Sequence, residues 1–278
     1  MVESIRELRK ICYRNSDKKR PLYMEMFTMK ISIYVTKLLL YMPIHADQVT
    51  ISMVLLAIIG SGMMAFGSIL AMFIGITLIH FTVILDNVNG EIARYRKEGS
   101  LTGTFLEELY HTVSIPFIFF SLGYGVFSHT GARSAIIFGF LAAIFAAPIV
   151  LTSIKTAVVK KGMGRLEGKK GMLPKKYTML NSEINVKGGS TKTGRELYSL
   201  YGKLREVWGF PFNILHIQVI LALELMNYYL SFMPAFLLPL VYIIIYSSVS
   251  VMRQIISFIV HYNGKTVFHY YNALFNKK

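Results

Sequence analysis

Six long apolar segments constrain the fold of this chain more than any other feature. A helix that crosses a bilayer needs about 20 apolar residues, and stretches of this length occur at 48–68, 69–95, 103–127, 134–158, 211–231 and 234–261. The apolar residues run continuously instead of alternating, which excludes transmembrane β-strands. Only 16% of the 278 residues are charged, against about 25% in soluble domains. We therefore predict an all-α integral membrane protein with six transmembrane helices.

The distribution of basic residues predicts the orientation of these helices. Lys and Arg are concentrated in the cytoplasmic loops of membrane proteins. Here the amino-terminal tail, the links after the second and fourth segments, and the carboxyl-terminal tail are basic, and Arg133 is the only one of the 30 bases on the opposite side. Both termini are therefore expected in the cytoplasm. Because topology accounts for the net charge of +15, no nucleic-acid partner is expected.

The chain is expected to have three parts. Residues 1–46 form a basic tail and an interfacial amphipathic helix, because 22–42 mixes apolar residues with Glu25, Lys30 and Lys37, a pattern typical of a helix in the membrane interface. Residues 47–262 form the six-helix domain, with Asp47 capping the first span and a basic cytoplasmic loop at 159–208. Residues 263–278 form a cytoplasmic tail. Cys12 is the only cysteine, which excludes an intrachain disulfide.

Polar and ionisable residues gather where the second segment ends and the third begins. Such residues are costly within a span and usually functional. Helical spacing places five residues on one face of the second helix and three on one face of the third: Asp86, Asn89, Gly90, Ala93 and Arg94, then Gly103, Glu107 and His111. A short turn joins these helices, so Asp86 and His111 should lie at similar depths. The oxygen ligands with one imidazole suit Mg²⁺ or Mn²⁺. The small residues leave room for a ligand, although they also suit close helix packing.

These residues resemble the signature of the CDP-alcohol phosphotransferase family, also called CDP-alcohol phosphatidyltransferases. The family pattern is Asp-x2-Asp-Gly-x2-Ala-Arg-x8-Gly-x3-Asp-x3-Asp. The same spacing here gives Asp86, Asn89, Gly90, Ala93, Arg94, Gly103, Glu107 and His111, so that five of the eight positions are identical. The segment Asp47-Gln-Val-Thr50 also looks like the family's Asn-Gln-Val-Thr before its first span. The family's six-helix bundle with an interfacial helix is similar to the layout predicted for about 20–262.

The resemblance implies transfer of a phosphoalcohol group, such as phosphatidyl, from a CDP-linked donor to an acceptor hydroxyl, with release of CMP, as in phospholipid biosynthesis. It implies a metal site at Asp86, Asn89 and Glu107 and a nucleotide site at Gly90, Ala93, Arg94 and Gly103. His111 stands at the position of the family's presumed general base. An imidazole with an unperturbed pKa of about 6.5 suits that role. His111 is alternatively a metal ligand, and it cannot then also be the base.

Three of the four family aspartates are replaced here, which leaves two interpretations. The chain is an active variant that binds one or two divalent ions, or a catalytically degenerate relative that binds nucleotide or lipid as a membrane scaffold. Replacement by Asn, Glu and His, which all remain able to bind a metal, favours the active variant. The donor is open between CDP-diacylglycerol and a soluble CDP-alcohol. Membrane lipids are further partners, a homodimer is possible, and the active site is expected to face the cytoplasm.

Overall fold

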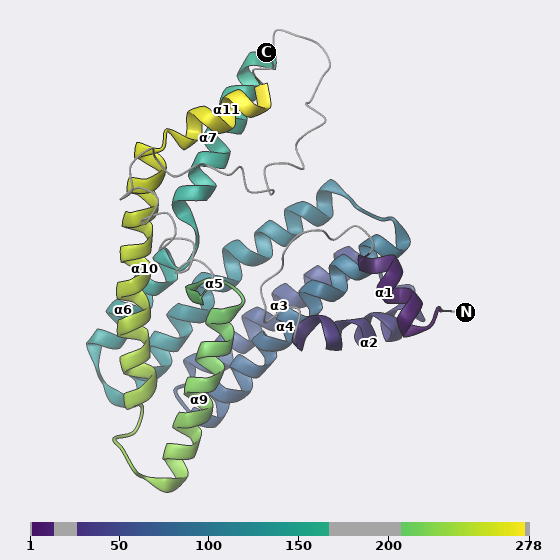
Figure 1. Ribbon diagram of the computed structural model, residues 1–278. Coiled ribbons are helices and arrows are strands. Elements are labelled where there is room, and N and C mark those ends of the chain that lie inside the picture. The colour runs from purple at the N-terminus through teal and green to yellow at the C-terminus, as the bar shows by residue number, and fades with distance from the viewer. Residues whose placement is uncertain (1, 14–26, 167–206, 276–278) are drawn as a thin grey trace. The chain divides into compact units, whose positions relative to one another are not determined.

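The computed structural model describes residues 2–13, 27–166 and 207–275, and these residues are helical with no strand among them (Figure 1). The helices are α1 (Ile5–Tyr13), α2 (Met29–Leu40), α3 (Ala46–Ala65), α4 (Ile69–Arg96), α5 (Leu101–Thr130), α6 (Arg133–Phe145), α7 (Ile149–Leu166), α9 (Phe212–Leu230), α10 (Leu237–Asn263) and α11 (Thr266–Phe275). Most of the basic loop predicted at 159–208 lies outside the described residues. The all-α prediction is confirmed for the described part.

Five of the predicted membrane spans are supported by the described helices. By length and composition, the segments able to cross a membrane are Ala46–Ala65, Ile69–Arg96, Leu101–Thr130, Arg133–Val159 and Leu237–Asn263. The segment predicted at 211–231 also forms a helix, α9, but it is not one of these five. Polar residues along α9, including Asn213, Gln218 and Glu224, lower its apolar character. The fold is therefore that of a multi-pass membrane protein, and a membrane span at 211–231 stays a prediction.

The fourth predicted span contains a break that the hydropathy pattern does not show. Helix α6 ends at Phe145 and α7 begins at Ile149, with Pro148 between them. Proline lacks the backbone N–H that helix continuation requires and disfavours helical geometry at the preceding residue. The apolar run is thus continuous in sequence but is divided into two helices.

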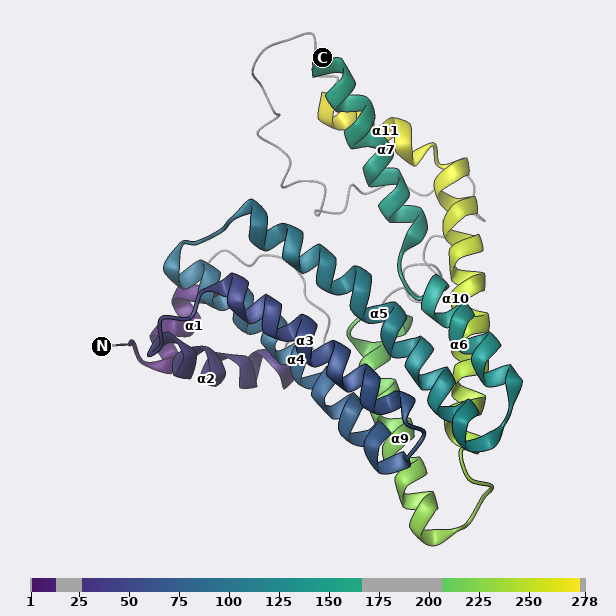
Figure 2. The same ribbon diagram turned by 180° about the vertical axis from the view of Figure 1, so that it is seen from behind.

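The described residues divide into two compact units, one within 1–147 and 208–248 and the other within 148–207 and 249–278. In the first unit, α3 packs against both α4 and α5, α5 packs against α6, and α4 packs against α9. Helices α1 and α2 pack against each other and against α4, and Figures 1 and 2 both place them beside one end of α4. In the second unit, α7 packs against α11.

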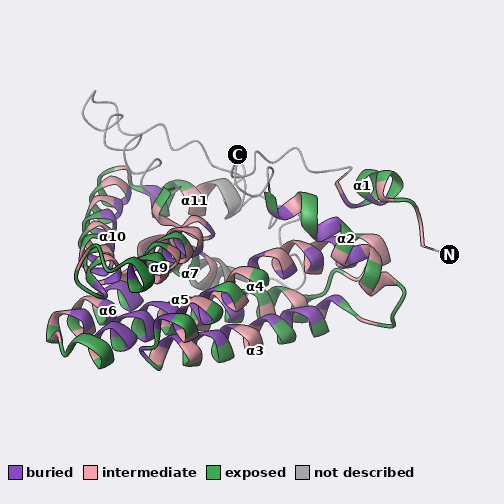
Figure 3. Ribbon diagram, turned by 90° about the horizontal axis from the view of Figure 1, so that it is seen from below, coloured by how far each residue is buried: buried purple, intermediate pink, exposed green. Residues whose placement is uncertain are grey.

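Glycines allow very close contact between helices of the first unit. The long helices carry both buried and exposed residues along their length (Figure 3), and α3 meets α4 where Gly60 faces Gly75. A Cβ atom added to Gly75 would lie 2.4 Å from the carbonyl oxygen of Gly60, which is too short for any real contact. In a membrane, where apolar burial gives little drive between helices, such close packing is a main source of stability.

The start of α3 corrects one prediction. Asp47 was expected to cap this helix, but the cap is His45, whose backbone is extended at φ −89° and ψ 157°. The backbone N–H of His45 donates to Gln48 Oε1 at 2.9 Å, which stabilises the chain at the helix start. Asp47 therefore lies within the first turn, where its negative charge still favours the helix N-terminus.

Helix α2 lies within the segment predicted to be interfacial, and it exposes several apolar side chains while it buries two hydroxyl groups. Ser32 and Thr36 are fully buried, whereas Ile31, Tyr34 and Leu38 are 49%, 60% and 61% exposed. An exposed apolar stripe on a helix suits contact with acyl chains at the membrane surface. The preceding helix α1, in a tail for which no helix was predicted, buries Leu8 and Cys12.

Candidate metal centre

The motif residues lie on α4 and α5, which are joined by a short turn. Helix α4 ends at Arg96, and the following residue, Lys97, caps it in a left-handed conformation with φ 58°. Helix α5 then begins after Ser100, whose Oγ accepts a hydrogen bond from the Gly103 N–H at 2.8 Å. The Ser100 side chain satisfies a backbone donor of the first turn, and only four residues separate the end of α4 from the start of α5. The chain thus reverses as predicted, and the motif residues of α4 and α5 are brought to the same end of the first unit.

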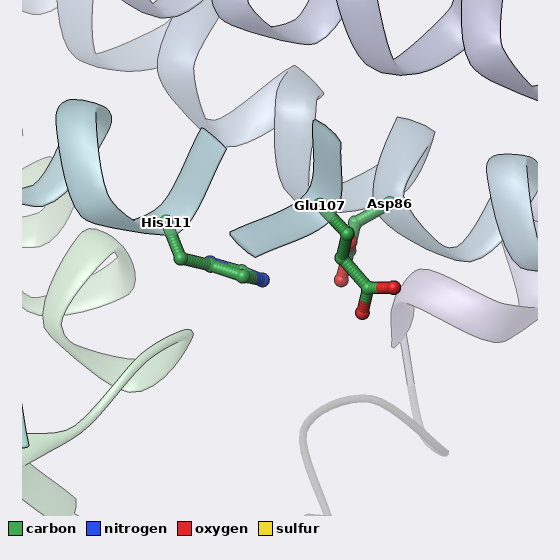
Figure 4. Close-up of side chains that lie close together, drawn as sticks. All are labelled: Asp86, Glu107 and His111. Atoms are coloured by element: carbon green, nitrogen blue, oxygen red, sulfur yellow. The ribbon is translucent and has the colours of Figure 1, made fainter. Parts of the chain in front are cut away.

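Three of the predicted site residues meet between these helices. Asp86 of α4 and Glu107 and His111 of α5 each offer one ligand atom, and these atoms all lie within 4.8 Å of one another. Figure 4 shows the His111 ring directed toward the two carboxyl groups. Asp86 and His111 are half-buried, and Glu107 is exposed. This grouping brings Asp86 close to His111, and their similar depth in the membrane stays a prediction.

The donor set fits a divalent cation. Neighbouring ligands of one octahedral Mg²⁺ ion, each at about 2.0–2.1 Å from it, lie about 2.9 Å apart. Side-chain movements of about 1 Å each therefore bring all three groups onto one ion. Two carboxylates and an imidazole are ligands that Mg²⁺ and Mn²⁺ accept. Because Glu107 is exposed, the group is open on one side, and an ion held there would stay accessible to a further oxygen ligand.

Side chains that the motif does not include hold this group in place. Tyr110 is 1% exposed, and its hydroxyl is hydrogen-bonded to Thr82 Oγ1 of α4 at 2.5 Å. The Phe210 ring lies edge-on to His111, with ring centroids 4.9 Å apart, and it also contacts the Tyr110 ring. The hydrogen bond between Tyr110 and Thr82 fixes the register of α5 against α4. The contact between Phe210 and His111 limits the rotation of the imidazole. Neither was predicted, because Thr82 and Phe210 carry no feature that distinguishes them in the sequence.

The other motif residues of α4 follow Asp86 within eight positions of the sequence. Gly90 lies beside the Arg94 guanidinium, since a Cβ atom added to Gly90 would be 3.0 Å from Arg94 Nη1. Arg94 is itself exposed, and its role in binding a nucleotide stays a prediction. Ala93 packs against a buried cluster formed by α3, α4 and Tyr110, so that it serves helix packing. Asn89 is half-buried on α4, and its role as a ligand stays a prediction.

Gly103 has a local role in addition to the predicted one. A Cβ atom added there would lie 3.0 Å from Asp47 Oδ1 and 3.2 Å from Ser100 Oγ. The absence of a side chain thus lets the Asp47 carboxylate of α3 approach the first turn of α5. This contact also joins the Asp47-Gln-Val-Thr50 segment to the motif. Its role in binding a nucleotide stays a prediction.

No protein-family model matches this chain, and no curated protein matches it. The resemblance to CDP-alcohol phosphotransferases therefore depends on the motif residues themselves and on the arrangement of the helices that carry them.

Proposed function

We propose that the protein is a metal-dependent CDP-alcohol phosphotransferase of the membrane. It transfers a phosphoalcohol group from a CDP-alcohol to an acceptor hydroxyl and releases CMP. One observation carries this proposal, namely that Asp86, Glu107 and His111, at the spacing of the family motif, place their ligand atoms within 4.8 Å of one another. A set of this kind at the end of two apolar helices has no evident structural purpose, and ionisable groups in such positions are usually functional.

Asp86, Glu107 and Asn89 are the residues proposed to hold Mg²⁺ or Mn²⁺, with His111 beside them. When bound, the ion supplies neutralisation of charge on the donor pyrophosphate and on the leaving CMP. Asp86 is fixed by a helix that packs on α3 and α9, whereas Glu107 is exposed and able to adjust to the substrate. Arg94 is proposed to pair with a phosphate of the donor, because a planar guanidinium is able to donate two parallel hydrogen bonds to phosphate oxygens.

His111 is proposed as the general base or as a further ligand, and these roles exclude each other. As the base, neutral His111 takes the proton of the acceptor hydroxyl on a ring nitrogen. The acceptor oxygen then forms a bond to the phosphorus that carries the alcohol, and the bond from this phosphorus to the CMP oxygen breaks, so that CMP leaves with the bonding electron pair. Packing of Phe210 against the ring holds the imidazole in one orientation, which favours proton transfer at a defined atom.

The proposal includes six spans, cytoplasmic termini and a cytoplasmic active site. The span proposed in addition to the five candidate spans is α9, which is helical over 19 residues. The basic links on one side support the orientation, and the exposed apolar face of α2 supports contact with the membrane surface. A cytoplasmic site gives access to the CDP-linked donor and to anionic acceptors.

Release of CMP by the purified protein tests the proposal. The protein is reconstituted in nanodiscs and supplied with Mg²⁺ or Mn²⁺, one CDP-alcohol (CDP-diacylglycerol, CDP-choline or CDP-ethanolamine) and one acceptor (glycerol phosphate, inositol phosphate or diacylglycerol). We expect CMP release from at least one pair, none with EDTA, and none from Asp86→Asn. If no pair of donor and acceptor releases CMP, the proposed phosphotransferase activity is excluded. In that case Mn²⁺ or nucleotide binding without turnover identifies a non-catalytic binding protein.

A further inference from the structure

A second face of α4 carries a ladder of polar side chains that bind the amino-terminal region. The ladder consists of Asn87, Glu91 and Tyr95, which recur every four residues. Asn87 Nδ2 donates to Thr28 Oγ1 at 3.1 Å, and the Tyr95 hydroxyl donates to Glu3 Oε2 at 2.5 Å. Because each contact of the ladder joins α4 to a residue at least 55 positions earlier in the chain, the ladder is a tertiary feature.

Glu91 is the centre of this ladder and is completely buried. One carboxylate oxygen accepts hydrogen bonds from the Tyr13 hydroxyl and from Ser32 Oγ, the latter at 2.5 Å, and the other accepts from Thr36 Oγ1 at 2.6 Å. A buried carboxylate is costly unless such donors satisfy it. The Cys12 thiol also contacts the backbone carbonyl oxygen of Glu91 at 3.6 Å.

The ladder and the motif lie on different faces of the same helix. Each residue of an α-helix advances about 100° around the axis, so that Glu91, five residues after Asp86, lies about 140° from it. A rotation of α4 by roughly 20° would move a side-chain tip on its surface by about 2 Å. Metal–ligand distances tolerate only about 0.2 Å. The orientation of Asp86 toward Glu107 and His111 thus depends on what prevents α4 from turning.

We propose that Glu91 is a positioning residue for the metal centre. By binding hydroxyl groups of α1 and α2 on one face, it fixes the rotation of α4 and so aims Asp86, on the other face, at the ligands of α5. Helix α1 is then part of the support of the site. This inference depends on the proposed function, because it assumes that the three side chains bind a divalent ion.

Two measurements on the full chain test this proposal without any substrate. Cys12 is the only cysteine and is 1% exposed, so that its rate of reaction with a maleimide reports release of α1 from α4. Because the charge of Glu91 also raises the pKa of this thiol, Tyr13→Phe, which keeps that charge, separates release of α1 from a change in the thiolate fraction. Binding of Mn²⁺, followed by the loss of the EPR signal of the free ion, reports the geometry of the site. The variants are Glu91→Gln and the milder Tyr13→Phe, which removes one donor and leaves Ser32 and Thr36. Glu7→Gln is the matched control, since Glu7 is an exposed glutamate of α1 that binds only the nearby Ser4 in the described structure.

We expect Glu91→Gln to speed the labelling of Cys12 and to weaken Mn²⁺ binding roughly tenfold, in line with other supporting residues of metal sites. Tyr13→Phe should change both in the same direction by less, and Glu7→Gln should change neither. Faster labelling with unchanged Mn²⁺ affinity would mean that Glu91 only attaches α1, which overturns the proposal. Unchanged labelling overturns it as well. If the wild type itself binds no Mn²⁺, the proposed function fails and this inference fails with it, whereas equal binding by wild type and both variants overturns the inference alone.

Discussion

Replacement of Asp86 by asparagine should stabilise the metal-free protein and remove its stabilisation by metal. Two carboxylates, those of Asp86 and Glu107, are held within 4.8 Å of each other. At that separation two unit charges repel by about 3.5 kcal/mol at an effective dielectric constant of 20 and by about 0.9 kcal/mol in water. Because Glu107 is exposed, the actual value falls within this range, at about 1 to 3 kcal/mol. Asp86→Asn removes this repulsion and keeps the shape of the side chain.

The assay is thermal unfolding followed by circular dichroism, with the protein in one detergent and with either EDTA or excess Mn²⁺. In EDTA, Asp86→Asn should unfold at a higher temperature than the wild type. In Mn²⁺ at about 100 times its dissociation constant, the wild type should gain about 2.7 kcal/mol, and Asp86→Asn should gain much less. Glu108→Gln, which removes the neighbouring charge on α5, is the control and should keep the gain. A less stable Asp86→Asn in EDTA, or an equal gain in Mn²⁺, would refute the reasoning.

Three further predictions concern packing, proton transfer and the amino-terminal helix. Gly75→Ala should lower the melting temperature, at a cost of about 1–3 kcal/mol, because its Cβ would meet Gly60. The control Gly62→Ala, whose Cβ meets nothing within 4 Å, should not lower it, and equal melting temperatures of the two variants would contradict the close contact. His111→Asp should move the acidic limb of the pH–rate profile to lower pH, since an unperturbed aspartate loses its proton about 2.6 pH units below histidine; an active variant with an unchanged profile would show that His111 is not the base. Burial, with a contribution from the charge of Glu91, raises the pKa of the Cys12 thiol to about 11. The rate of alkylation of Cys12 should therefore still increase about tenfold per pH unit between pH 8 and 10, and a plateau of this rate near pH 9 would contradict the prediction.

The membrane spans could be predicted because their signal is local and strong. Apolar runs of more than 20 residues have few other structures available to them, and five of the predicted segments match the helices of the described chain. Hydropathy is less informative where single residues decide the structure. Pro148 divides one apolar run into two helices, and the polar residues of α9 place it outside the five candidate spans.

The grouping of the three candidate metal ligands was predictable for a related reason. Asp86, Glu107 and His111 are ionisable residues in apolar sequence, and a spacing of four residues places Glu107 and His111 on one helical face. A short turn was enough to bring this face to Asp86. The support of the centre was not predictable in this way, because the partners of Glu91 lie 55 to 78 positions away. Glu91 itself stands among the charged residues at the end of α4, where nothing local indicates that it is buried.

The most direct test of the central claim is a Mn²⁺ titration of the wild type and of two neighbouring variants, Glu107→Gln and Glu108→Gln. These glutamates are adjacent on α5 and are both exposed, but only Glu107 belongs to the group that also contains Asp86 and His111. We expect saturable binding to the wild type, binding weakened at least tenfold in Glu107→Gln, and unchanged binding in Glu108→Gln. Equal affinity in all three proteins, or no saturable binding to the wild type, would contradict the central claim.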